Sequence, residues 1–438
     1  MNLEVAKKPD LKKNVYLQLS LILLAGFLLR IFLSTLITYE PDFGTWQGWG
    51  RALSNDGFSQ FYDKNWCDYM PGYLYILWIL NEFHMAMPWL SVHILFKLPA
   101  NLSDLGISIL IFVALRPIAS TRIAMISSLV YFFNPASLSN STFWGQVDSV
   151  HAFPMLFSII LSLRKRFVLS GLFAALAFMI KPQSIVLFPI IGFIAIDPFF
   201  RSTERWNINN FIPSAKIIIT IIVTCTIITL PFIWDKIDSF FYIFTGPIEL
   251  IKERFDTAYE QYKYASLNAF NFWGAFAMWK SDELLFLMLS YKSWGTIIFG
   301  TFYTLIFVSL FKFNLLRKDK ENKEFTYLIF QAVTLILFAL FLFVTRAHER
   351  HVLPSIVFFT LIMFRSWIFP YLYAIVSGVY VCNMIYAYIQ LTTEYSGVPD
   401  EIEKVLIPSM FVLYLIAFAL MFLDYLNRIL KQKDSLNS

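Results

Sequence analysis

Charged residues and cysteines are scarce in this sequence of 438 residues. Charged side chains make up only 15% of it, whereas soluble chains contain about 25%. The three cysteines, Cys67, Cys225 and Cys382, show no metal-ligand spacing, and two of them fall inside apolar runs. This pattern excludes a disulfide framework and a cysteine-ligated zinc site. No low-complexity linker or second soluble domain is visible, so we expect one domain over residues 1–438.

A concentrated basic patch is also missing. The formal net charge of +5 comes from lysines and arginines scattered between apolar runs. Proteins that bind nucleic acid gather such residues on one face, so no nucleic-acid partner is expected.

Apolar residues are abundant instead. They make up 58% of the chain and include 47 phenylalanines, and the mean hydropathy is +0.61. This composition predicts an all-α, multi-pass membrane protein with membrane lipid around it. The first apolar run, residues 15–37, is long enough to span a bilayer and lacks a small-residue cleavage site, so it predicts a retained helix and not a signal peptide.

Twelve apolar runs are candidates for transmembrane helices, although some are short or polar for a span of about 20 residues. The run at residues 71–94 is interrupted by polar residues too early to cross, and we expect an interfacial or re-entrant helix there. The twelve predicted spans are residues 15–37, 96–115, 122–140, 147–163, 168–181, 183–199, 212–234, 294–313, 325–345, 351–369, 370–390 and 405–426.

The basic residues then predict the orientation, because short cytoplasmic loops are enriched in lysine and arginine. With the N-terminus in the cytoplasm, every basic cluster in a short loop falls on the cytoplasmic side. The segments 38–95 and 235–293 become long external loops, and such loops are usually functional. The cytoplasmic clusters are residues 7–13, 116–122, 164–166, 201–205, 317–323, 365 and 428–433.

Two aspartates of the first external loop are candidate general bases. Asp42 follows the first span, and Asp68 precedes the interfacial helix, with Tyr69 beside it. A carboxylate at this depth can accept the proton of a sugar hydroxyl, and the neighbouring aromatic side chains suit stacking on sugar rings. The alternative is that Asp42 only caps the helix that follows it.

Two further motifs lie at the predicted outer ends of spans. In Trp144-Gly145-Gln146-Val147-Asp148, the side chains of Trp144, Gln146 and Asp148 are candidates for binding sugar or acceptor, although Asp148 can equally cap the next helix. In Lys181-Pro182-Gln183, proline favours the first helical turn, which places Lys181 at a helix N-terminus where anions are attracted. For Lys181 the alternative is snorkelling to lipid headgroups.

The run His348-Glu349-Arg350-His351 concentrates ionisable residues between two apolar stretches. Charge at the edge of the hydrocarbon layer often marks a site. One carboxylate among three basic side chains suits an anion such as a phosphate, with Glu349 holding the others in place. The alternative is a polar connector between two helices. Within the spans, Arg30 and Asp104 are each expected to form a structural ion pair, with the other or with a neighbour, because no chain of acidic residues suggests a proton path.

Taken in order, these motifs resemble the GT-C glycosyltransferases over about residues 39–352. Within that superfamily the chain is most similar to bacterial mannosyltransferases related to the second mannosyltransferase of GPI-anchor synthesis. It is also similar to the glucosyltransferases that use dolichyl-phosphate glucose. Those enzymes carry a glutamate two residues after the first aspartate, where this chain has Gly44, so their acceptor contacts are not carried over.

The resemblance implies a GT-C fold, a polyprenyl-phosphate-sugar donor and inversion at the anomeric carbon. By position it makes Asp42 the general base, with Asp68 as second candidate. His348, Glu349, Arg350 and Lys181 would form the donor phosphate site, and Gln146, Asp148, Trp144, Gln183 and Tyr69 would contact sugar or acceptor.

The resemblance further implies no cofactor and no metal, which agrees with the absence of a His-x-x-x-His pair. The acceptor would be a lipid-linked saccharide, a glycan or a protein. The membrane would be the bacterial cytoplasmic membrane, or that of the endoplasmic reticulum in a eukaryote, with the site facing away from the cytoplasm. The alternatives are a transporter or flippase, which should show paired repeats or broken helices, and a ligase that uses a polyprenyl-diphosphate donor.

Overall fold

The computed structural model describes residues 11–316 and 322–437. The predicted cytoplasmic residues at 7, 8, 317, 318 and 320 lie outside this part of the chain. The described part is almost entirely helical, and its strands pair only into two small two-stranded sheets.

Eight helical segments of the described chain are long and apolar enough to cross a membrane. The all-α, multi-pass architecture is therefore confirmed. The eight are α1 (Leu11–Leu33), α5 (Val92–Leu115), α12 (Ile212–Thr229), α15 (Tyr291–Leu316), α16 (Asn322–Phe343), α18 (Phe369–Thr392), α19 (Asp400–Asn437) and the run of η2 (Pro182–Leu187), α10 (Phe188–Ala195) and α11 (Asp197–Arg201).

The other four predicted spans coincide with shorter helices, namely α6 (Thr121–Phe132), α8 (Asp148–Leu163), α9 (Phe167–Ile180) and α17 (Leu353–Ile362). The predicted span at 122–140 is not one helix, because α6 ends at Phe132 and the chain continues through α7 (Pro135–Ser137) into the π-helix η1 (Leu138–Trp144). Twelve crossings stay a prediction.

The centre and the lipid-facing rim of the bundle differ in burial. In the apolar window of α16, 89% of the residues are buried, against 17% in that of α15. Hydropathy is high in both helices, so composition alone did not separate the central helix from the peripheral one.

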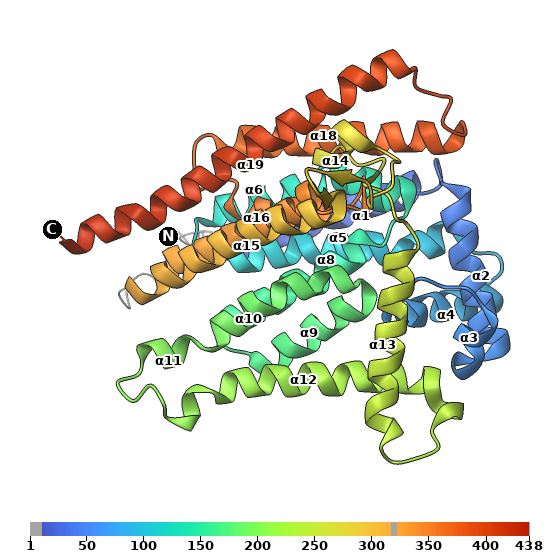
Figure 1. Cartoon of the computed structure of the whole chain (residues 1–438), viewed down its shortest axis with the longest axis horizontal. Coiled ribbons are helices and arrows are strands. Elements are labelled where there is room, and N and C mark those ends of the chain that lie inside the picture. The colour runs from blue at the N-terminus through green and yellow to red at the C-terminus, as the bar shows by residue number, and fades with distance from the viewer. Residues whose placement is uncertain (1–10, 317–321, 438) are drawn as a thin grey trace, which may run out of the picture.

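The helices of the two long connecting segments gather at one end of the bundle. These are α2 (Glu40–Asp56), α3 (Phe58–Lys64), α4 (Pro71–Ala86), α13 (Tyr242–Glu260) and α14 (Phe272–Ala277). Figure 1 shows α2, α3, α4 and α13 at the end opposite α11 and the end of α19. The short helix expected within 71–94 is confirmed as α4, which ends at Ala86 before α5 begins.

A buried ion pair ties α1 to α5. Arg30 and Asp104 are 2.7 Å apart, so the predicted pairing is confirmed. Arg30 also donates to Ser137 Oγ at 2.7 Å, and Asp104 accepts from the hydroxyls of Tyr131 and Ser149 at 2.6 Å. Because a buried charge needs several partners, this network fixes the segment between α6 and α8.

The run that contains His348 is attached to the second long segment. Strand β1 (Ser266–Leu267) pairs in parallel with β4 (Ala347–His348). Nearby, Arg346 is bonded to Asp282 with 2.7 Å between Nε and Oδ2. A second sheet, of β2 (Leu285–Phe286) and β3 (Leu289–Ser290), forms a hairpin directly before α15.

Candidate functional site

Asp42 lies in the first turn of α2, but it does not cap that helix. The N-cap residue is Tyr39, and no side chain caps the end. Instead, Asp42 Oδ2 accepts hydrogen bonds from Trp144 Nε1 at 3.0 Å and from Gln146 Nε2 at 2.6 Å. The capping interpretation is therefore wrong, and the two motifs are joined across 102 residues of sequence.

A tight turn places Trp144 and Gln146 against Asp42. Gly145 ends η1 with φ +85°, a conformation that favours glycine. A Cβ atom at this position would lie 2.8 Å from Lys97 Cγ. Lys97 is itself buried and donates to the carbonyl oxygens of Ser34, Ile37 and Phe143, so it holds the end of α1 beside the turn.

The expected contact of Trp144 and Gln146 with sugar stays a prediction, and both side chains are buried. Trp144 is 4% exposed and Gln146 is fully buried. The indole ring of Trp144 packs on Tyr39, with 5.1 Å between ring centroids, and its N–H is used by Asp42. Both side chains donate hydrogen bonds to Asp42 and thereby orient its carboxylate.

Asp148 connects the same segment to the cationic residues. It is 1% exposed, and its Oδ1 is 2.6 Å from Lys181 Nζ. Its Oδ2 accepts from Asn140 Nδ2 at 3.3 Å and is 3.9 Å from Arg350 Nε. Although α8 begins at Asp148, the carboxylate makes no cap bond, so the capping alternative is wrong. Direct contact of Asp148 with sugar or acceptor stays a prediction.

Lys181 is at the N-cap position of η2, directly before Pro182, as the sequence indicated. Burial lowers the pKa of its ammonium group, and the carboxylate of Asp148 opposes this effect. Its pairing with Asp148 contradicts the alternative of snorkelling to headgroups, because the charged end points into the protein.

The His348 run is a turn that presents one permanent cation. Arg350 Nη1 donates to Glu349 Oε1 at 2.7 Å, and Glu349 is 1% exposed while Arg350 is 17% exposed. Glu349 thus holds Arg350 from behind, as expected, and burial raises the pKa of this glutamate. The chain then enters α17, with Pro354 in its first turn.

The two histidines of the run lie next to the cationic residues. Burial, together with Arg350, lowers the pKa of both His348 and His351 well below the ordinary value. His351 Nδ1 accepts a hydrogen bond from the His348 backbone N–H at 3.2 Å, and its Nε2 is 3.3 Å from the amide of Gln183. These lowered pKa values disfavour a histidine as the expected third cation, so Lys181 and Arg350 are the principal cations of this cluster.

Asp68 and Tyr69 are the other candidate site residues from the first loop. Burial raises the pKa of Asp68, the charges of Arg350 and Lys181 lower it, and Asp42 raises it further. Asp68 of the first loop is therefore electrostatically coupled to Arg350, Lys181 and Asp42. The ring of Tyr69 packs on Trp49, with 5.1 Å between centroids.

Sequence reasoning missed three residues of this site: Lys97, Asn140 and Tyr262. Tyr262 packs edge-on against His348, with 5.4 Å between ring centroids. Lys97 had a signal, since a lysine inside an apolar span is costly and needs partners. Asn140 and Tyr262 carried none, because only the fold brings them near charged groups.

An apolar cavity of about 280 Å³ adjoins the site. It lies between α13, α16 and η2, and its lining passes from Phe255 and Leu340 to Gln183, Arg346 and His351. A hydrocarbon chain here would have its polar end beside the cationic residues.

Buried polar atoms without partners also mark the site. Asn140 Oδ1 and Gln146 Oε1 accept no hydrogen bond in the described part of the chain. Such atoms are unusual in a folded interior. Within the described residues, no group of three or more His, Cys, Asp or Glu side chains is placed to hold a metal ion.

Comparison with known proteins adds no relative to this geometry. A scan against protein-family models finds no match, and neither does a search of curated proteins.

Proposed function

We propose that this chain is a membrane glycosyltransferase that transfers a hexose from a polyprenyl-phosphate donor to an acceptor hydroxyl, with inversion. One observation carries the proposal. The short segment 140–148 holds a carboxylate, Asp42, through Gln146 and a pair of cations, Lys181 and Arg350, through Asp148. Base and anion site are thereby fixed relative to each other, which group transfer requires.

Asp42 is the general base of this proposal. Its Oδ2 accepts hydrogen bonds from two neutral donors, Trp144 and Gln146, which fix the carboxylate. In this proposal the acceptor hydroxyl binds at Oδ1. The acceptor O–H gives its proton to this carboxylate as its oxygen attacks the anomeric carbon. The bond from that carbon to the phosphate oxygen breaks, and the phosphate leaves with the electron pair.

Lys181 and Arg350 stabilise the leaving phosphate. Each is held by a buried carboxylate, yet each keeps further N–H donors and some exposure, 12% for Lys181 and 17% for Arg350. Preorganised cations aimed at developing negative charge lower the barrier. The cavity beside Gln183 and His351 takes the polyprenyl tail, which requires an apolar wall next to a charged mouth.

The resemblance to GT-C glycosyltransferases supports the same assignment, including a GT-C fold and an extracytoplasmic site. Mannose or glucose is the hexose that the resemblance favours. The gathering of polar residues at one end of the bundle favours an enzyme over a transporter, whose site is expected near the midplane.

The test is transfer by the Asp42→Asn variant in proteoliposomes that contain a radiolabelled polyprenyl-phosphate hexose. We expect the rate to fall by about 10²–10⁴-fold. Glu40→Gln is the matched control, because Glu40 lies in the same helical turn and is exposed; it should transfer normally. Full activity of Asp42→Asn would remove Asp42 as the base, and loss only in Asp68→Asn would give that role to Asp68.

A further inference from the structure

The β2–β3 hairpin has an unusual turn. Its two central residues, Leu287 and Met288, have φ values of +46° and +72°. This left-handed conformation is normally taken by asparagine and glycine. The chain instead keeps two long apolar side chains there, and they are 71% and 94% exposed. Exposure of this kind in water is unfavourable, so the tip has a function that requires apolar side chains.

The hairpin lies where a membrane-spanning helix begins. Strand β3 ends at Ser290, and α15 starts at Tyr291. Its first turn contains Lys292 and Trp294, residue types that are typical of the boundary between lipid and water. Since α15 is mostly unburied, its surface faces lipid, and the apolar hairpin continues that surface.

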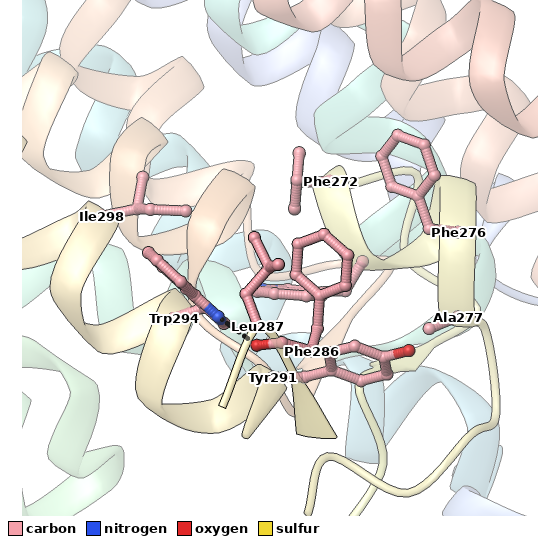
Figure 2. A pocket seen from close by; sticks show the side chains of 9 residues that line it. Phe272, Phe276, Ala277, Phe286, Leu287, Tyr291, Trp294 and Ile298 are labelled. Atoms are coloured by element: carbon pink, nitrogen blue, oxygen red, sulfur yellow. Dashed lines mark hydrogen bonds between the residues drawn. The ribbon is translucent and has the colours of Figure 1, made fainter. Parts of the chain in front are cut away.

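A cavity of about 390 Å³ lies between the hairpin, α14 and α15. Figure 2 shows Phe286 and Leu287 from the hairpin beside Trp294 and Ile298 of α15. The lining consists of Phe272, Trp273, Phe276, Ala277, Phe286, Leu287, Tyr291, Trp294 and Ile298.

The polar atoms of the tryptophans are already used. Trp273 Nε1–H donates to the Phe343 carbonyl and Trp294 Nε1–H to the Phe286 carbonyl, both at 2.7 Å. The cavity therefore offers aromatic and aliphatic surface without a free indole donor. Such a lining selects hydrocarbon over sugars or peptides.

We propose that this cavity binds one acyl chain of a bilayer phospholipid and that the hairpin tip is immersed in the same leaflet. The donor tail is assigned to the other cavity, because Gln183 and His351 line that one, whereas no residue of the cationic site lines this one. The bound lipid anchors the second long segment, to which the His348 run is joined through β1 and β4.

Immersion of the tip is tested with an environment-sensitive fluorophore on Met288→Cys in full-length protein. Cys382→Ser first removes the exposed thiol, since Cys67 and Cys225 are buried. In liposomes we expect quenching by nitroxide-labelled phospholipid and protection from aqueous iodide. The matched control is Glu283→Cys at the base of the hairpin, where the side chain is 67% exposed; it should respond to iodide. A Met288 probe that responds like the control would overturn the immersion.

Occupancy of the cavity is tested by native mass spectrometry of the purified protein with phosphatidylcholine. We expect one phospholipid retained by the wild type and its loss in Ala277→Phe, which fills the cavity. The paired variant Leu287→Asn, Met288→Gly suits the turn and should fold even where Ala277→Phe does not; it should also lose the lipid. Equal retention in these variants, or displacement by added polyprenyl phosphate, would refute the proposal. Neither measurement depends on transfer activity. A negative result for lipid binding can therefore be distinguished from a negative result for the proposed glycosyltransferase activity.

Discussion

Replacing Lys181 with methionine separates the structural role of its charge from its role at the proposed phosphate site. Methionine keeps the length and apolar stem of the side chain but removes the ammonium group. Asp148, at 1% exposure, then loses its partner at 2.6 Å. What remains is Asn140 Nδ2 at 3.3 Å and Arg350 Nε at 3.9 Å.

The expected loss in the free energy of unfolding follows because Asn140 and Arg350 compensate only in part for the missing ammonium group. Breaking a buried ion pair by removing one partner costs about 3–5 kcal/mol, because a buried charge is left alone. Since Arg350 and Asn140 still face Asp148, we expect a loss of about 2–3 kcal/mol in the free energy of unfolding. Asp148→Leu added to Lys181→Met removes both charges, and most of this loss should be regained. Transfer from the donor should stay low in both variants.

The assay is unfolding in lipid nanodiscs, followed for the single variant, the double variant and a surface control. Lys236→Met is that control, because Lys236 and Asp63 are also 2.7 Å apart but 45% and 46% exposed. A pair exposed to that degree contributes about 0–1 kcal/mol. Equal unfolding of Lys181→Met and Lys236→Met would refute the buried-pair argument. A double variant with normal donor titration would instead remove Lys181 from the phosphate site.

Three further predictions address the turn, the first loop and the orientation. Gly145→Ala should destabilise the chain by about 1–3 kcal/mol, since φ is +85°, and should lower the transfer rate; normal unfolding would contradict the strain. Burial raises the pKa of Asp68. The charged carboxylate therefore lowers the free energy of unfolding at a pH above this raised pKa, and that destabilisation is lost as the pH falls below the ordinary pKa of aspartate. Asp68→Asn should therefore raise the unfolding temperature at neutral pH but not in acid, and a gain that is independent of pH would speak against this linkage. Cys67 is fully buried, so an impermeant maleimide should not label it, whereas Glu204→Cys should be labelled from the cytoplasmic side and Asp238→Cys from the other; labelling of both from one side would overturn the predicted orientation.

The sequence by itself determined the class of protein and the residues that matter. Hydropathy is a property of the chain, so it indicated a multi-pass helical protein. Lys181, Asp148 and the His348 run stood out because charge beside apolar runs is costly wherever the chain folds. The pairing of Arg30 with Asp104 followed from the same cost.

Only the tertiary structure decided what each of these residues does. Asp42 and Asp148 carry the local pattern of helix caps, yet their carboxylates bind Gln146 and Lys181, far away in sequence. Capping is a local interaction, whereas these bonds depend on how η1 meets α2 and η2. The lowered pKa of His348 likewise depends on burial and on neighbouring cations. Residue types and their order can be read from a chain, but charge state and orientation arise from neighbours that only the fold supplies.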